Sequence, residues 1–390
     1  PIRNPYAPGA GSPPPDLAGR DELLASAETE MQRAAAGRFA KGVVFHGLRG
    51  VGKTVLLNTI RRRAEASGYA VISLEVPQKR SFLSALLPAI RKTLIRLSTL
   101  ESLRARYGKA RKFLNGLINS VKLRYDDVEV AVDLEAGTLD VTGDLETDLG
   151  DLLCEVGRAA KSGDTCVVLF IDEIQYIENA QLGTLLAAIH QVTQEQLPIL
   201  LFAAGLPQIT SLSGKARTYA ERLLSFQTVG ELSERHAREA LVAPACAEGV
   251  AYDPAALDAI VAETRGYAYF LQEWGRNVWD IAAESPITAA EARAATPISL
   301  AQLDESFFKV RFDQLTPAEK RYMRGMAELG EGPHRSGDIA EALGRKVESV
   351  APTRNSLIRK GMLYSPAHGD TAFTVPLFDG FMKRIMPQMP

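Results

Sequence analysis

The chain has 390 residues, 46% hydrophobic and 24% charged, which predicts a soluble globular protein of two or three domains rather than a single core. Its 45 basic and 47 acidic residues leave a net charge of −2, which argues against a protein that coats nucleic acid over its whole surface. The three cysteines are too few and too widely spaced for a disulfide framework, and neither they nor the five histidines have metal-ligand spacing. With no apolar signal core or membrane span in the sequence, we expect a cytoplasmic protein.

The N-terminal part of the chain divides at residue 16. Residues 1–16 are rich in proline and predict an extended arm, either disordered or laid over the surface. A helix is then expected from Leu17 to about Ala36, because Asp21 and Glu22 lie near its positive end.

The segment from residue 42 to residue 68 predicts a phosphate-binding loop between a strand and a helix. The apolar residues 42–46 indicate a buried strand, and Gly47–Thr54 (GLRGVGKT) fits the spacing G-x-x-x-x-G-K-T. Backbone N–H groups and the helix N-terminus would surround a polyphosphate, Lys53 would reach the β- and γ-phosphates, and the Thr54 hydroxyl would bind Mg²⁺. The expected nucleotide-binding residues of the loop are Gly47, Leu48, Arg49, Gly50, Val51, Gly52, Lys53, Thr54 and Val55.

Charge is strongly segregated after the next strand, which we expect at 69–76. Residues 79–124 carry twelve bases and one acid over two predicted helices, whereas residues 126–151 carry ten acids and no base. Alternating apolar and acidic residues from 128 to 134 predict a strand that turns into a partner at 139–141. A basic helical face paired with an acidic hairpin is favoured over a basic surface for phosphate-rich partners.

Two carboxylates follow the most apolar strand of the chain, at 165–171, which comes after a helix expected at 144–160. Its uninterrupted hydrophobic run is typical of a strand buried on both faces of a parallel sheet. Asp172 would hold Mg²⁺ opposite Thr54, and Glu173 is placed to polarise an attacking water. The alternative is a pair of acids that only caps the following helix.

Together these elements predict an α/β fold, a doubly wound parallel sheet of the P-loop NTPase type. A helix at 182–192, a strand at 198–204 and a strand leading to Val229 complete the core. We expect this core to span residues 17–231, with residues 79–143 as an insertion.

Alanine-rich amphipathic helices from Ser233 predict a small helical lid over residues 232–296. Helices are expected at 254–263 and 267–284, and the small residues of 285–297 are interpreted as a linker.

Residues 297–390 predict a winged helix. Three helices are expected at 317–329, 336–343 and 350–360, with Ser336 capping the second and Pro352 in the first turn of the third. A hairpin around His368–Asp370 would form the wing. The basic residues that could contact double-stranded DNA are Arg345, Lys346, Arg354, Arg359 and Lys360. DNA binding and protein contacts are equally compatible with this pattern.

The chain resembles AAA+/STAND-type P-loop ATPases, in particular those with an origin-recognition-complex-like ATPase module. The resemblance rests on the box Gly19–Glu22, the P-loop, the acidic strand end Leu169–Glu173 and the helix start at 266–271. It implies that ATP lies between the core and the lid, with Gly19 and Arg20 near the adenine and ribose. It also implies that Arg222 acts as a catalytic arginine in trans on a neighbouring subunit, so that a homo-oligomer is expected.

Two departures from the family pattern concern nucleotide sensing. The strand end at 202–204 lacks the expected polar residue, and the lid arginine is missing after Gly266, where Arg265 and Arg276 are the nearest alternatives. Slow hydrolysis and switch behaviour are therefore expected. The leading hypothesis is an ATP-dependent, DNA-associated switch with Lys53 and Glu173 as catalytic residues. The alternatives are a STAND-like signalling scaffold with protein partners and a degenerate nucleotide binder.

Overall fold

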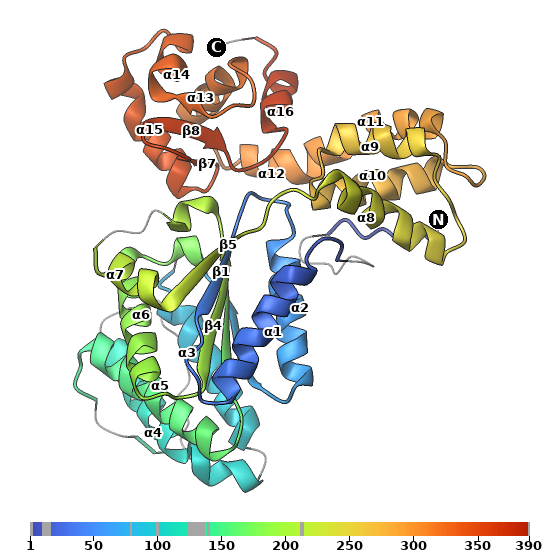
Figure 1. Cartoon of the computed structure of the whole chain (residues 1–390). Helices are drawn as coiled ribbons and strands as arrows, with labels where there is room; N and C mark the ends of the chain where they lie inside the picture. The colour runs from blue at the N-terminus through green and yellow to red at the C-terminus, as the bar shows by residue number, and fades with distance from the viewer. Residues whose placement is uncertain are drawn as a thin grey trace.

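The computed structural model describes residues 3–9, 17–78, 80–98, 101–122, 137–138, 141–210 and 214–388. Three parts are visible in Figure 1: an α/β core, a set of lid helices beside it, and a C-terminal unit above the sheet. Within the described residues, no helix is both long and apolar enough to cross a bilayer.

The core is built on a five-stranded sheet in which every pair is parallel, in the order β2-β3-β4-β1-β5. The strands are β1 (Gly42–His46), β2 (Ala70–Glu75), β3 (Val167–Asp172), β4 (Ile199–Gly205) and β5 (Leu224–Thr228). In register, His46 lies opposite Gly205, and Glu75 lies opposite Asp172. The carboxyl ends of all five strands therefore meet at one edge, as the doubly wound fold predicted from the sequence requires.

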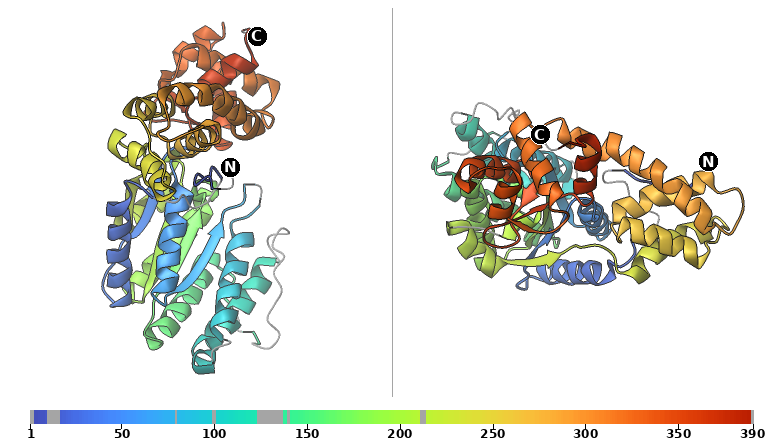
Figure 2. Two further views of the ribbon diagram at one scale, coloured as in Figure 1. Left: turned by 90° about the vertical axis from the view of Figure 1, so that its right-hand side faces the viewer. Right: turned by 90° about the horizontal axis from the view of Figure 1, so that it is seen from above.

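Successive residues of the strands feed two separate cores. Val43 and Phe45 pack with α1 (Asp21–Ala35) and α2 (Lys53–Ala66) on one face of the sheet. Val44 faces the other side, where a larger cluster lies under the remaining core helices. These helices are α3 (Leu83–Ser98), α4 (Glu101–Lys122), α5 (Leu145–Ser162), α6 (Asn179–Gln194) and α7 (Gly214–Leu223). The two layers are visible on either side of the sheet in Figures 1 and 2.

The two basic helices of the insertion are present as α3 and α4. Lys109 of α4 pairs with Glu155 of α5 at 2.8 Å, so part of the basic surface contacts the core. The acidic hairpin expected at 128–141 lies almost entirely outside the described residues, and its pairing with these helices stays a prediction.

The lid contains four helices: α8 (Glu234–Ala247), α9 (Pro254–Thr264), α10 (Ala268–Ile281) and α11 (Ala289–Leu303). The prediction of a linker at 285–297 is wrong, because most of these residues belong to α11. Thr288 and Glu291 form a reciprocal capping box at the start of this helix, and alanine has a high helix propensity. A boundary between residues 296 and 297 would cut α11, which continues to Leu303.

The described part of the N-terminal arm packs on the lid. The Tyr6 hydroxyl donates to the Leu241 carbonyl oxygen and lies 2.8 Å from the Tyr252 hydroxyl. A Cβ atom at Gly275 would lie 2.6 Å from the Tyr6 ring, so the glycine makes room for it. Of the two forms expected for the arm, residues 3–9 adopt the one laid over the surface.

The C-terminal unit has the element order of a winged helix. Its elements are α13 (Pro317–Glu328), β6 (His334–Arg335), α14 (Ser336–Ala342), α15 (Val347–Arg359), β7 (Leu363–Tyr364), β8 (Asp370–Phe373) and α16 (Phe378–Ile385). The strands form an antiparallel sheet in the order β6-β8-β7, which contains the expected wing hairpin.

Two local expectations for this unit are wrong. α15 begins at Val347 rather than at residue 350, so Pro352 lies inside the helix and not in its first turn. Ser336 does not cap α14, because its hydroxyl donates to the Gly369 carbonyl oxygen of the wing and Arg335 occupies the N-cap position. The wing thus binds the start of α14 directly.

The lid and the C-terminal unit share one hydrophobic core. A π-helical turn, η3 (Asp304–Phe308), and the short α12 (Lys309–Phe312) connect them. Phe308 stacks on Phe381 with ring centroids 5.2 Å apart and contacts Phe270 of the lid edge to face. Because these contacts are buried in a single cluster, the lid and the C-terminal unit pack as one body.

Candidate nucleotide-binding site

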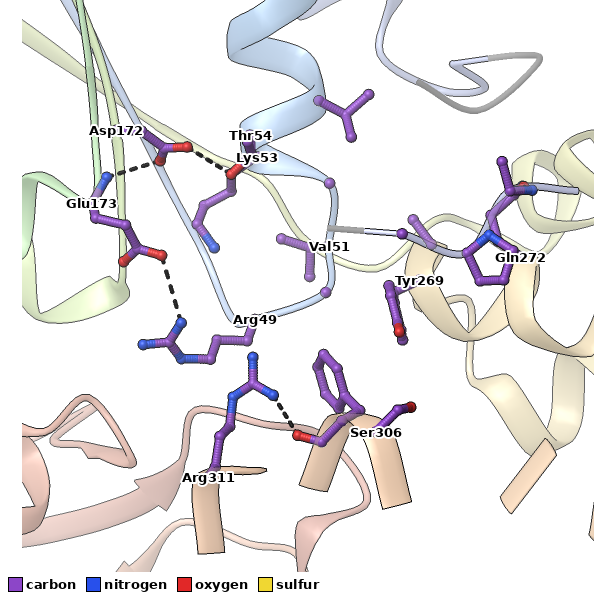
Figure 3. A pocket seen from close by; sticks show the side chains of 18 of the residues that line it. Arg49, Val51, Lys53, Thr54, Asp172, Glu173, Tyr269, Gln272, Ser306 and Arg311 are labelled. Carbon is purple, nitrogen blue, oxygen red and sulfur yellow. Dashed lines mark hydrogen bonds and ion pairs between the residues drawn. The ribbon is translucent and has the colours of Figure 1, made fainter. Parts of the chain in front are cut away.

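A cavity of about 600 Å³ lies at the carboxyl edge of the sheet. Residues 49–55 of the P-loop and α2 form one wall, and Asp172 and Glu173 form a second. The lid and the segment 306–314 close it from the opposite side, as Figure 3 shows. This size and position are those of a small-ligand site in an open α/β sheet.

Glycines shape the P-loop in three places. Gly50 and Gly52 have φ values of 82° and 91°, which side chains other than glycine rarely adopt. A Cβ atom at Gly47 would lie 2.0 Å from the Val229 carbonyl oxygen. The loop therefore turns tightly into α2, whose N-terminus faces the cavity as a site for anions.

Each of the three structural parts makes a backbone hydrogen bond to the P-loop. The sheet accepts one from Gly47 N to Gly205 O at 3.2 Å. The lid donates one from Tyr269 N to Gly50 O at 2.9 Å, and the C-terminal unit accepts one from Arg49 N to Thr374 O at 2.9 Å. A change in loop conformation would therefore alter hydrogen bonds to both the lid and the C-terminal unit.

Lys53 is a buried cation held by its own loop. Its ammonium group donates to the Leu48 carbonyl oxygen at 2.7 Å. Burial lowers the pKa of Lys53 to about 8, and the nearby carboxylate of Glu173 only partly opposes this. A cation that has lost its water in this way can form strong, charge-assisted hydrogen bonds to the phosphates of a nucleotide.

Thr54 and Asp172 provide a pair of hard oxygen ligands. The Thr54 hydroxyl donates to Asp172 Oδ2 at 2.7 Å, and Glu173 N donates to Oδ1 at 2.8 Å. Burial raises the pKa of Asp172, so a cation beside it would be stabilising. The pair fits Mg²⁺, and the described residues contain no cluster of three or more acidic, histidine or cysteine ligands. Such an ion would take its other ligands from phosphate and water.

Glu173 faces the same cavity in a constrained conformation. Its φ of 54° is left-handed, and its carboxylate lies 3.5 Å from the Arg49 guanidinium. Gln175 also donates to this carboxylate, while its own Oε1 accepts from Leu206 N at 2.9 Å. Gln175 thus links Glu173 to the end of β4, beside the position where the sequence lacks a polar residue.

Comparison with known families identifies this part of the chain. Residues 16–202 match the family described as "AAA ATPase domain". The match identifies residues 16–202 as an AAA ATPase domain. Its site is therefore that of an ATP-hydrolysing P-loop enzyme, and the expected ATPase class is confirmed. Residues 305–382 match a second family, described as "Domain of unknown function (DUF8462)".

The chain is similar to many solved structures, among them three proteins of low sequence identity. For the RuvB Holliday junction branch migration motor of Thermotoga maritima, identity is 16%, coverage 91% of this chain and 92% of that chain, and TM-score 0.46. For the ORC1 protein of Aeropyrum pernix in complex with DNA, the corresponding values are 16%, 95%, 94% and 0.45. For Cdc6p from Pyrobaculum aerophilum they are 13%, 97%, 97% and 0.47. None of the curated proteins matches the chain.

Several residues predicted for the ATPase site do not line the cavity. Gly47, Leu48 and Gly19 are outside its lining, although the first two position the loop. Arg20 lines it, but its guanidinium donates to Val51 O at 3.2 Å and Gly230 O at 2.6 Å, which supports the loop from behind. Arg222 lies exposed in the last turn of α7, outside the lining.

Two features of the ATPase site were missed from the sequence. Arg311 of α12 points into the cavity opposite the P-loop (Figure 3), whereas Arg265 and Arg276 are not among the lining residues. At the other end, the arm residues 7–9 form part of the wall, where Ala7 N donates to Gln272 Oε1 at 3.2 Å. The sequence signal for Arg311 was weak, a single arginine among the phenylalanines of 307–312.

The basic residues expected to face DNA fall into two groups. Arg354 donates to Thr371 Oγ1, Ser365 Oγ and Asp370 O, so it fastens α15 to the wing. Lys360 pairs with the buried Glu319 at 2.7 Å and lines the nucleotide cavity. The expectation that Arg354 is free to contact DNA is therefore wrong, whereas DNA contact through Lys360 stays a prediction. Arg345, Lys346, Arg359 and Lys360 are exposed, and of these four Lys360 is held in an ion pair.

Proposed function

We propose that the protein is an ATP-dependent switch in which the nucleotide decides how the lid and the C-terminal unit are held. The observation that carries this proposal is the double attachment of the P-loop. Tyr269 N binds Gly50 O from the lid, and Thr374 O binds Arg49 N from the C-terminal unit. A triphosphate that reorganises the loop would change both bonds at once, and the shared core would transmit the change.

In this proposal, the site binds ATP through the P-loop amides and Lys53. The Lys53 ammonium would leave the Leu48 carbonyl oxygen for the β- and γ-phosphates, which provide charge-assisted bonds. Thr54 and Asp172 would hold Mg²⁺, which when bound neutralises charge on the phosphates. Arg20 would keep the loop in place through Val51.

Glu173 is proposed as the group that orients and polarises the attacking water. In the structure its carboxylate is engaged by Arg49 and Gln175, and it must be released before it can accept a hydrogen bond from water. This engagement supports slow hydrolysis, as expected of a switch rather than a motor. The exposed position of Arg222 is compatible with its action in trans on a second subunit, which also stays a proposal.

DNA is proposed as the partner of the C-terminal unit. Arg345 and Lys346 are exposed at the start of α15, and Arg359 is exposed at its end. A helix of this kind with a wing beside it can enter a major groove, and its cations would contact phosphates.

A protein partner is the second candidate. Arg354 and Lys360 are both bound within the unit, so the basic face is smaller than the sequence indicated. If the protein has no affinity for DNA, this smaller basic face favours a STAND-like scaffold whose winged helix contacts protein.

We expect Arg345→Ala combined with Lys346→Ala to weaken DNA binding and to flatten its salt dependence. Each lost phosphate contact should reduce the slope of log affinity against log salt by about 0.9. Fluorescence anisotropy of a labelled duplex, titrated with ATP-loaded protein at four salt concentrations, measures both quantities.

The matched control for this test is Lys383→Ala on α16, an exposed lysine of the same unit that lies outside α15. It should leave affinity and slope unchanged. Wild-type protein that shows no binding at low salt, or binding without salt dependence, would remove DNA from the proposal and leave the protein scaffold.

A further inference from the structure

Arg311 is a largely buried guanidinium with no acidic partner. Its side chain lies over the Phe307 ring at 4.2 Å and donates to the Phe307 carbonyl oxygen. Among the described residues, no carboxylate is within ion-pair distance of Arg311. Buried cations are stable in proteins when an anion or hydrogen-bond acceptors compensate the loss of water.

The charge around Arg311 is also unbalanced. Burial and the nearby cation of Arg49 lower the pKa of Arg311 to about 10, and Tyr269, Glu173 and Tyr176 act in the opposite direction. The cavity lining holds more cations than carboxylates, and the Asp172 carboxylate is occupied by the Thr54 hydroxyl and the Glu173 amide. The cations are Arg20, Arg49, Lys53, Arg311 and Lys360, and the carboxylates are Glu75, Asp172 and Glu173. The cavity therefore has positive groups on two opposite walls and room for an anion between them.

The support of Arg311 connects it to the P-loop. The Phe307 ring stacks on the Tyr269 ring with centroids 4.7 Å apart and an interplanar angle of 23°. The Tyr269 backbone N–H in turn donates to Gly50 O. Arg311 is thus held at a fixed place opposite the phosphate-binding loop, and Figure 3 shows it beneath Arg49 with its guanidinium directed into the cavity.

We propose that Arg311 binds the terminal phosphate of ATP, so that residues 305–382, which match a domain of unknown function, supply a side chain to the nucleotide site. The terminal phosphate is favoured because Arg311 lies beneath Arg49 in the cavity, and the Arg49 guanidinium is 3.5 Å from the carboxylate of Glu173, the group proposed to polarise the attacking water. ADP lacks this phosphate and would leave Arg311 with only its contacts to Phe307. The inference rests on the nucleotide site proposed above.

The test compares a non-hydrolysable ATP analogue with ADP, using calorimetry on the full chain. For Arg311→Met, which replaces the charged group by an unbranched apolar side chain, we expect affinity for the analogue to fall about 10- to 100-fold. Affinity for ADP should change by less than about twofold. Arg311→Lys should recover part of the loss, because it restores the charge but not the planar fork.

Lys309→Ala is the matched control, two residues away on the same short helix. Lys309 is absent from the cavity lining and pairs with Glu305, so both affinities should equal those of the wild type. The melting temperature of each nucleotide-free variant reports on folding independently of binding.

Three results would overturn the inference. Equal losses for the analogue and ADP would indicate a structural role, and unchanged affinity for the analogue would exclude contact with the terminal phosphate. No recovery in Arg311→Lys, together with a lower melting temperature of both Arg311 variants, would point to packing alone. The calorimetric assay contains no DNA, so absence of DNA binding would not affect the test of Arg311. Likewise, a negative result for Arg311 would not affect the DNA proposal.

Discussion

Lys53→Ala is expected to abolish measurable binding of ATP and ADP. Lys53 is the cation of the P-loop, and its ammonium lies within 2.7 Å of a loop carbonyl oxygen that phosphate oxygens would replace. Each charge-assisted hydrogen bond contributes about 1.5–3 kcal/mol. Loss of two such bonds predicts an affinity at least about 100-fold lower. Calorimetry or displacement of a fluorescent nucleotide would measure it.

The same variant should fold at least as stably as the wild type. Burial lowers the pKa of Lys53 to about 8, below the ordinary value of 10.5, so keeping this side chain protonated in the folded state costs folding free energy at neutral pH. Alanine removes that cost. A nucleotide-free melting temperature at or above the wild-type value would separate lost binding from lost folding.

Lys41→Ala provides the control for this substitution. Lys41 is exposed immediately before β1, at the end of that strand opposite the loop, and it does not line the cavity. The nucleotide affinity of Lys41→Ala should equal that of the wild type. Retained binding in Lys53→Ala would mean that the phosphates lie elsewhere, and the site proposed here would have to be abandoned.

The core of the fold was predictable because its signals are local and strong. A parallel strand buried on both faces needs a continuous apolar run, and β4 is buried at all seven positions. The P-loop has a fixed glycine spacing for a steric reason, as the Val229 carbonyl oxygen beside Gly47 demonstrates. Since carboxyl ends of parallel strands share an edge, the contact between Thr54 and Asp172 followed from the same pattern.

The wrong predictions have two causes, a weak or overlooked local signal and contacts between residues distant in sequence. α11 resembled a linker because its alanines carry no amphipathic pattern, and its capping box at Thr288 was overlooked. Arg354 looked available for DNA, but three acceptors of the wing, distant in sequence, bind it. Arg311 could not be placed, because its position depends on how α12 lies over the P-loop, which no local pattern encodes.

The wrong predictions also bear on function, because they concern how the protein senses the nucleotide. Sequence reasoning placed the sensing of nucleotide in the lid, where an arginine was missing after Gly266. The structure instead brings a segment from beyond the lid to the cavity, through the aromatic stack of Tyr269 and Phe307. The C-terminal unit is therefore in contact with the ATP site, which is what a switch that presents this unit would require.

Glu173→Gln should separate ATP binding from ATP hydrolysis. A carboxylate that accepts a hydrogen bond from the attacking water contributes about 10²- to 10⁴-fold to the rate, and an amide cannot take up the proton. We therefore expect turnover to fall by about that factor. Affinity should be unchanged or slightly higher, since the substitution releases Arg49 from its ion pair with Glu173 and makes it available to phosphate.

The comparison that makes this result specific uses two other acids. Glu178→Gln alters an exposed residue outside the cavity, so its turnover should equal that of the wild type. Asp172→Asn should instead weaken the dependence of activity on Mg²⁺, because Asp172 is the carboxylate bonded to Thr54. Phosphate release and nucleotide affinity, measured on the same preparations, distinguish the three. Wild-type turnover in Glu173→Gln would contradict its role, and the constrained left-handed backbone at Glu173 would then serve the contact with Gln175 rather than the chemistry.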